Sequence, residues 1–178
     1  MITENRRNGG GLLVQIETLT SWLESYHERQ RDLDATYERL ERLESKLTSP
    51  RMATLTGLPG AAASDPDRLA HALAELQELR EATTEQAAAL RDLRHRIEGA
   101  VRLIDGPGWP NRRAVLRMRY IDGEQWETIA QMLFGRDPDF QMKQDSYIRR
   151  VYKIRKAALR TLARNPRIDE YTRGGKEQ

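Results

Sequence analysis

An unbroken heptad repeat of apolar residues near the start of the chain predicts a long helix there. From Leu12 to Leu47 the repeat positions alternate spacings of four and three residues, and nine of the eleven are apolar. They are Leu12, Ile16, Leu19, Leu23, Tyr26, Gln30, Leu33, Tyr37, Leu40, Glu44 and Leu47. A helix of about 36 residues is roughly 54 Å long. Because such a helix is not stable alone in water, the sequence predicts a second element that covers its apolar stripe.

A second apolar repeat of similar length follows residues 48–66, which are rich in glycine, proline and alanine. Ser64 or Asp65 is a suitable N-cap, and Pro66 is a suitable first residue of the helix. Its apolar positions include Leu69, Leu73, Leu76, Leu90, Ile97, Val101 and Ile104. The first repeat therefore has a helical partner within the same chain.

Two helices of similar length predict an antiparallel helical hairpin over residues 12–106, joined by the loop 48–66. Folding back near Gly57 would place Gln30 beside Gln86, and two polar residues meeting there would fix the register of the hairpin. Heptad repeats of this length also join separate chains, so a homo-oligomer through the N-terminal helices stays equally open. Residues 1–11 are expected to be flexible.

Charge is distributed unevenly along the chain, although the net formal charge is only +3. Residues 1–110 hold 14 Lys and Arg against 18 Asp and Glu, whereas residues 111–164 hold 13 against 6. Such an asymmetry is typical of a nucleic-acid-binding module joined to a neutral or acidic module.

The segment from Asn111 to Phe134 has the pattern of two short helices separated by a tight turn. Val115, Leu116, Met118 and Tyr120 lie on the first helix, and Asp122-Gly123 ends it because this dipeptide favours turns. The second helix has an inward set of apolar residues, which is Trp126, Ile129, Ala130 and Leu133.

The third helix of this region, residues 147–164, combines an apolar stripe with a basic face and contains no acidic residue. Ile148, Val151, Ala158 and Leu162 recur at helical spacing, with Ile154 or Arg155 between them. The cations Arg149, Lys153, Lys156 and Arg160 recur on another face, beside Arg150, Arg155 and Arg164. Like charges at these spacings repel each other, so the face favours a dense external negative charge such as a phosphate backbone.

These three segments resemble region four of sigma-70-type factors, in particular the phage-encoded sigma-like late-gene regulators. The match comprises VLRMRYIDGEQWETIAQML and the closing basic helix, with Trp126 and the pair Ile129-Ala130 at the places of the family's aromatic residue and Ile-Ala pair. The resemblance implies a three-helix helix-turn-helix domain over residues 109–164 that binds promoter DNA and contacts host RNA polymerase. It implies a transcription regulator of phage or prophage type.

In such a regulator the last helix enters the major groove and the preceding helix braces it. Base edges would be contacted by Tyr147, Arg149, Arg150 and Lys153, since arginine to guanine is the commonest specific contact. Phosphates would be held by Lys156, Arg160, Arg112 and Arg113.

The chain departs from the family between its second and third helices, where residues 135–145 form an insertion. Gly135 is expected to end the second helix in the left-handed conformation, and Pro138 prevents its continuation. Asp145 or Ser146 is expected to cap the next helix. The insertion is therefore predicted to be an ordered loop, with Phe140 or Met142 packed onto the core.

Two other functions remain open from the sequence. A phage small terminase subunit also combines a helix-turn-helix with an assembly domain, to recognise DNA for packaging. Alternatively, the basic helix docks on RNA polymerase or another protein, and the chain is an adaptor that does not bind DNA.

Catalytic, metal and cofactor sites are not predicted. The chain has no cysteine, its three histidines have no partner ligand at helical spacing, and it lacks phosphate-binding glycine motifs. No segment is long and apolar enough to span a membrane, so a cytoplasmic protein of a bacterial host is expected. Trp109 is expected to plug the junction before the last domain, and residues 165–178 to form a flexible tail.

Overall fold

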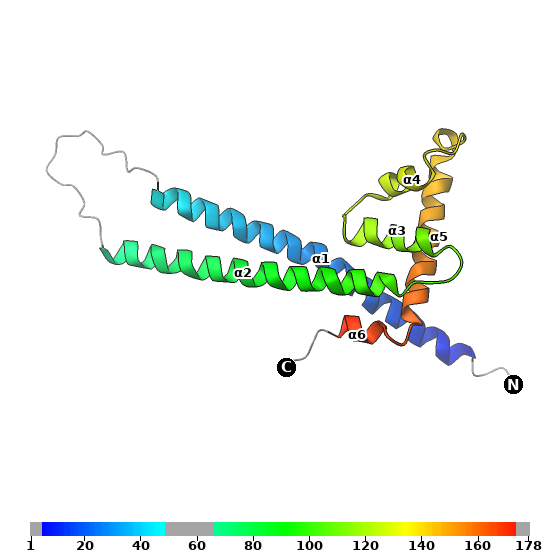
Figure 1. The fold of residues 1–178 in the computed structure, drawn as a ribbon, viewed down its shortest axis with the longest axis horizontal. Coiled ribbons are helices and arrows are strands. Elements are labelled where there is room, and N and C mark those ends of the chain that lie inside the picture. Colours follow the sequence, from blue (N-terminus) through cyan, green and yellow to red (C-terminus); the bar gives the residue numbers. More distant parts are fainter. Residues whose placement is uncertain (1–4, 49–65, 174–178) are drawn as a thin grey trace. The chain divides into compact units, whose positions relative to one another are not determined.

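All regular structure in the described part of the chain is helical (Figure 1). The computed structural model describes residues 5–48 and 66–173, with the side chains of residues 11–47 and 70–173. Its elements are α1 (Asn5–Thr48), α2 (Pro66–Arg102), α3 (Trp109–Tyr120), α4 (Trp126–Phe134), the 3-10 helix η1 (Gln141–Lys143), α5 (Gln144–Ala163) and α6 (Ile168–Thr172). The predicted all-α fold class is confirmed, and Pro66 is the first residue of its helix as predicted.

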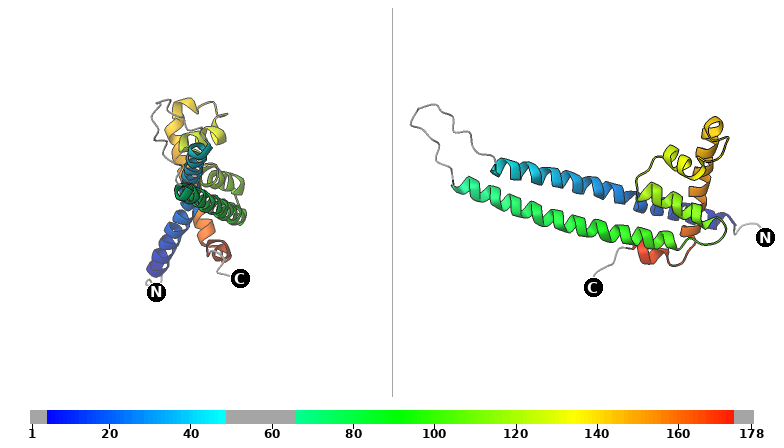
Figure 2. Two further views of the ribbon diagram at one scale, coloured as in Figure 1. Left: turned by 90° about the vertical axis from the view of Figure 1, so that its left-hand side faces the viewer. Right: turned by 45° about the horizontal axis from the view of Figure 1, so that its top comes forward.

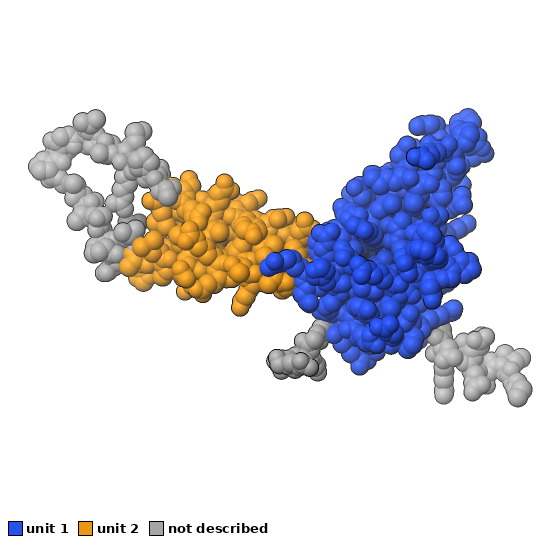
Figure 3. All heavy atoms as spheres, viewed as in Figure 1, with its two compact units in different colours: residues 1–28, 91–178 blue, residues 29–90 orange. Residues whose placement is uncertain are grey.

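The chain divides into two compact units, one of residues 1–28 with 91–178 and one of residues 29–90 (Figure 3). This division differs from the predicted boundaries at residues 106 and 109. The reason is that α1 and α2 each run through both units, and Leu23 and Leu93 are buried in the first of them. A long helix does not end where its packing partners change.

In the unit of residues 29–90, α1 and α2 run side by side in opposite directions (Figure 1, Figure 2). The Arg39–Glu75 and Arg80–Glu44 ion pairs, at 2.6 and 2.7 Å, join the two helices. Because these pairs are exposed to solvent, each contributes under about 1 kcal/mol. The predicted turn near Gly57 and the caps at residues 64 and 65 lie outside the described residues.

Among the described side chains of this unit, the buried polar residue is Thr83, and neither glutamine of the expected pair is buried. Gln30 and Gln86 are both exposed, whereas Thr83 is 5% exposed and lies between the helices with Leu33 and Leu76. Its hydroxyl donates a 2.6 Å hydrogen bond to the carbonyl oxygen of Leu79. A threonine satisfies its polar group on its own helix, whereas a buried glutamine amide would need partners from the other helix.

Both ends of the chain are more helical than predicted. Helix α1 begins at Asn5, since extending an existing helix adds one hydrogen bond for each residue fixed. At the other end, residues 168–172 form α6, in which Ile168 is buried. The Arg96 guanidinium donates to the carbonyl oxygens of Tyr171 at 2.5 and 2.8 Å and of Thr172 at 3.2 Å. The segment predicted to be a flexible tail thus contains a short packed helix, and the segment predicted to be a flexible N-terminus is helical from Asn5.

Helices α3, α4 and α5 pack against one another around a small apolar core. Gly123, with φ of 75°, forms the predicted turn between α3 and α4, where a left-handed conformation suits glycine. The buried side chains of the core are Val115, Ile129, Ala130, Phe134, Phe140 and Val151. Partly buried hydrophobic residues, among them Trp126, Leu133, Ile148 and Ile154, pack around them.

The insertion between α4 and α5 is ordered, but it begins and ends differently from the prediction. Gly135 has φ of −62° and is right-handed; a Cβ there would lie 2.4 Å from the Gln131 carbonyl oxygen, so close approach favours glycine. Because η1 leads directly into α5, neither Asp145 nor Ser146 caps the helix. Phe140 is packed onto the core at 2% exposed, whereas Met142 is 80% exposed.

Candidate nucleic-acid interface

Helix α5 separates its apolar and cationic residues onto opposite faces. Val151, Ala158 and Leu162 are fully buried. At about 100° per residue, the four cations spaced by four, three and four residues fall within about 60° of arc on the other side. These four exposed residues are Arg149, Lys153, Lys156 and Arg160, and they are called the basic face below. Burial of the apolar stripe thus forces the basic face outward.

The basic face is not neutralised by the protein's own carboxylates in the part of the chain that is described. None of the ion pairs there includes a residue of the basic face. By contrast, the nearby Lys143 is paired with Asp139 at 2.5 Å. Four unpaired cations on one helix repel each other, and an external polyanion relieves this repulsion.

Arg112 and Arg113, expected to hold phosphates, make contacts inside the protein. Arg113 donates to the carbonyl oxygens of Ile104 and Arg102 at 2.8 and 2.7 Å, and its guanidinium lies 4.3 Å from the centre of the Trp109 ring. It therefore satisfies backbone groups at the end of α2. Trp109 is 44% exposed, so it packs with Arg113 and is not the buried plug that was predicted.

Arg112 is half-buried and lies beside α5 away from the basic face. Its Nη1 atom donates a long 3.4 Å hydrogen bond to the hydroxyl of Thr161. Thr161 is one residue after Arg160, which rotates its side chain by about 100° around the helix. The structure therefore does not bring Arg112 or Arg113 together with the basic face.

Tyr147 and Arg150, which were expected to contact base edges, both pack against aromatic residues of the core. The Tyr147 ring packs between Phe134 and Phe140, with ring centres 5.4 and 5.3 Å away. Loss of surrounding solvent and a hydrogen bond with Asp137 raise the pKa of Tyr147. The Arg150 guanidinium is exposed but lies 4.6 Å from the centre of the Phe134 ring. Of the predicted base-reading set, Arg149 and Lys153 are left without such contacts.

Tyr152 is an exposed aromatic residue beside the basic face that the sequence pattern did not single out. It is 44% exposed, and its ring centre lies 4.7 Å from that of Trp126, the first residue of α4. Arg119 lies over the same tryptophan, 4.8 Å from the ring centre. The sequence does place Tyr152 between Arg149 and Lys156 at helical spacing, and this pattern could have identified it. Its contact with Trp126 of α4 could not be predicted from the sequence.

A groove of 540 Å³ runs along the side of α5 nearest Tyr152, within the unit of residues 1–28 and 91–178. Tyr152 and Lys156 form one wall, and residues of α1 form the other. The lining is Ile16, Glu17, Thr20, Ser21, Tyr152, Arg155, Lys156 and Leu159. The basic face is thus bordered by a concave surface with hydroxyl groups and one carboxylate.

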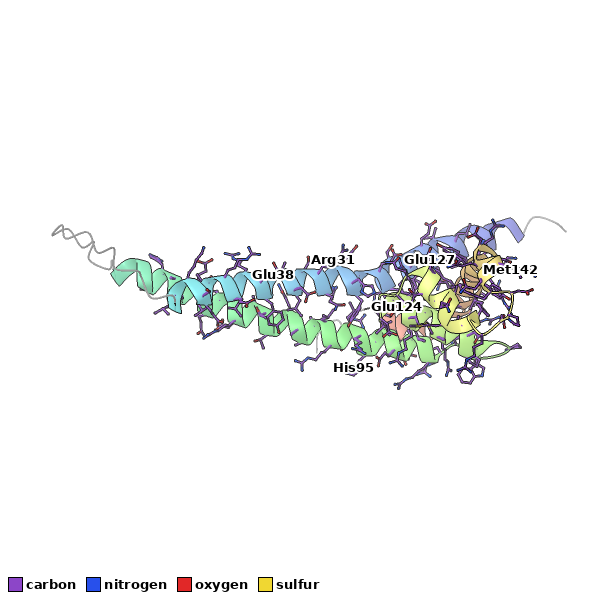
Figure 4. All side chains as sticks on the ribbon, turned by 90° about the horizontal axis from the view of Figure 1, so that it is seen from above. Arg31, Glu38, His95, Glu124, Glu127 and Met142 are labelled. Atoms are coloured by element: carbon purple, nitrogen blue, oxygen red, sulfur yellow. The ribbon has the colours of Figure 1, made fainter. Side chains whose placement is uncertain are left out.

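The insertion lies at the amino-terminal end of α5, whereas the start of α4 lies beside the middle of α5, where Trp126 packs on Tyr152. Met142 projects into solvent from η1, and Glu124 and Glu127 lie at the start of α4 (Figure 4). A shallow hollow at the start of α5 is lined by Gln141, Met142, Lys143, Gln144, Asp145, Ser146 and Arg149. The hollow therefore holds one carboxylate, that of Asp145, together with Arg149, the first cation of the basic face.

Comparison of the chain with protein-family models, curated proteins and solved structures found no match. Among the described helices, none has both the length and the apolar content needed to cross a membrane. In the same residues, no three histidine or carboxylate side chains gather closely enough to hold a metal ion.

Proposed function

We propose that this chain is a DNA-binding transcription regulator of phage or prophage type. In this proposal α4 and α5 act as a sigma-factor-like helix-turn-helix, with α5 in the major groove of promoter DNA. The observation that carries the proposal is the basic face of α5, which is exposed, opposite the buried face and free of ion pairs within the described residues. Helix α5 has 20 residues, which gives a length of about 30 Å, enough to cross the groove.

Different parts of the basic face have different proposed roles. Arg149 and Lys153, in the first half of α5, contact base edges, where an arginine makes two hydrogen bonds to guanine. Lys156 and Arg160, in the second half, hold phosphates and set the orientation of the helix. Arg113 and Tyr147 have internal contacts and are left out of the interface.

The proposed partners are double-stranded DNA, host RNA polymerase and a second copy of the chain, in the cytoplasm of a bacterial host. Tyr37 and Leu73, in the unit of residues 29–90, are 49% and 51% exposed. The heptad repeats of the two long helices are the feature that supports self-association, since such repeats commonly join separate chains. Light scattering of the purified chain distinguishes a monomer from a dimer or a larger ring, and a large ring would favour the DNA-packaging role instead.

Selection of binding sites from random DNA duplexes tests the proposed function. We expect a defined sequence to be enriched, and its affinity to fall steeply as salt concentration rises. Failure to bind any duplex at low salt, where electrostatic attraction is strongest, would overturn the proposal and favour the protein-docking adaptor.

A further inference from the structure

Tyr152 is held in a fixed position at the border of the basic face. Its ring stacks on Trp126 with centres 4.7 Å apart and an angle of 40° between the planes. Arg119 lies over Trp126 and also donates a 3.0 Å hydrogen bond to the carbonyl oxygen of Glu124, which keeps the start of α4 in place. Tyr152 is therefore oriented before any ligand arrives, and little side-chain entropy is lost when it makes a contact.

The neighbours of Tyr152 on α5 are cations that face the proposed DNA. Arg149 precedes it by three residues and Lys156 follows it by four, and these are the spacings at which helical side chains lie side by side. Tyr152 is partly exposed, and among the described residues its hydroxyl makes no hydrogen bond. It is a neutral donor located between two positive charges.

The surroundings of Tyr152 favour a backbone phosphate over a base edge. By helical rotation it lies about 60° to one side of Arg149, and it lines the groove whose far wall carries the hydroxyls of Thr20 and Ser21 and the carboxylate of Glu17. A side chain at the border of a helix in the major groove faces the strand that forms the groove's rim, and tyrosine is among the residues that commonly bind phosphate oxygens.

We infer that the Tyr152 hydroxyl donates a hydrogen bond to a phosphate of one DNA strand and so positions α5 in the groove. This inference rests on the proposed function and adds a neutral positioning residue to the cationic ones. Because the contact carries no charge, it contributes to affinity without releasing a counterion. It also carries no sequence information, so all sites should depend on it alike.

Tyr152→Phe isolates the hydroxyl, because the phenylalanine ring still stacks on Trp126. Tyr37→Phe is the matched control, since Tyr37 is also about half exposed but lies on α1 in the other unit. We expect Tyr152→Phe to weaken binding of the selected duplex about tenfold. We expect the salt slope, the base preference and the melting temperature to stay at the wild-type values, and Tyr37→Phe to bind as the wild type does.

Two results would overturn the inference while leaving the proposed function intact. One is wild-type affinity in Tyr152→Phe, which would make the tyrosine a packing residue. The other is a loss of discrimination at a single base pair, which would make it a base-reading residue. If the wild-type chain itself binds no duplex, the proposed function fails first, and that outcome is seen before any variant is compared.

Discussion

Arg155 lies inside the most basic helix of the chain, where its Nε atom donates a 2.8 Å hydrogen bond to the hydroxyl of Tyr120. Its guanidinium is also 5.8 and 5.7 Å from the centres of the Tyr120 and Trp126 rings. Tyr120 is 2% exposed, so this cation satisfies a buried hydroxyl. Helix α5 therefore places Arg155 against a buried group of the fold, whereas the four cations of the basic face are exposed.

Replacing Arg155 should affect stability and not DNA binding. We expect Arg155→Ala to lower the free energy of unfolding by about 2 kcal/mol, because it leaves the Tyr120 hydroxyl without its partner. Urea denaturation measures this loss, and duplex binding under folded conditions should stay at the wild-type level. An unchanged unfolding free energy together with lost binding would place Arg155 in the interface instead.

Stability should fall at alkaline pH through Tyr120. Burial raises the pKa of Tyr120 above its ordinary value of 10.0, although the charge of Arg155 and its hydrogen bond oppose the shift. The folded state therefore holds the phenol proton more tightly than the unfolded state. The stability from this group is complete below about pH 10 and is lost as the pH rises through the folded pKa.

Tyr120→Phe tests this contribution, because it removes the titrating group and keeps the ring. Urea denaturation between about pH 8 and 11 should show a smaller alkaline loss of stability for the variant than for the wild type. Parallel curves for the two proteins would show that Tyr120 does not contribute.

Two glycines on long helices should respond to alanine in opposite ways. At Gly99 a Cβ would lie 2.4 Å from the Cε1 atom of Tyr171, whereas at Gly11 nothing lies within 4 Å. Glycine to alanine in a helix normally stabilises by up to about 1 kcal/mol. We expect Gly11→Ala to raise the melting temperature, and Gly99→Ala to lower it because the Tyr171 ring must move.

Hydrogen exchange of α6 provides the control for this pair. Residues 168–172 should exchange faster in Gly99→Ala and at the wild-type rate in Gly11→Ala, since Tyr171 belongs to α6. Equal melting temperatures in the two variants would contradict the close packing of α6 on α2.

Lys156 and Arg113, both predicted from the sequence to hold phosphates, should behave differently. Lys156→Ala should weaken binding to all duplexes alike and reduce the salt slope by about one. Arg113→Ala should leave the slope unchanged and lower the free energy of unfolding by about 1–3 kcal/mol, because two backbone carbonyl groups lose their donor. A reduced salt slope for Arg113→Ala would show that Arg113 contacts DNA after all.

The sequence predicted those features that depend on local periodicity. The spacing of Val151, Ala158 and Leu162 predicted the buried face of α5 and hence the direction of its cations. The turn at Gly123 also followed from residue type and position, whereas the sequence left open whether Phe140 or Met142 packs onto the core. These features need no knowledge of what packs against the helix.

Features that depend on contacts distant in sequence could not be predicted in this way. From the sequence alone Arg113 is interpreted as a surface cation, because its hydrogen bond to the Ile104 carbonyl oxygen depends on the fold. The orientation of Tyr152 likewise depends on its contact with Trp126 of another helix. The five-residue helix α6 is too short for a periodic signal and is held by Arg96 and Gly99 of α2. The boundary between the units was missed because α1 and α2 continue through it without a break.

The salt dependence of duplex binding by a double variant of the basic face tests the central claim most directly. Arg149→Ala/Lys153→Ala removes two cations from the face, and Arg29→Ala/Lys46→Ala removes one arginine and one lysine from exposed positions on α1 as a matched control. The quantity measured is the slope of log affinity against log salt concentration. The account predicts that the magnitude of this slope falls by about two in Arg149→Ala/Lys153→Ala and stays at the wild-type value in the control. Equal slopes in the wild type and both variants would contradict it.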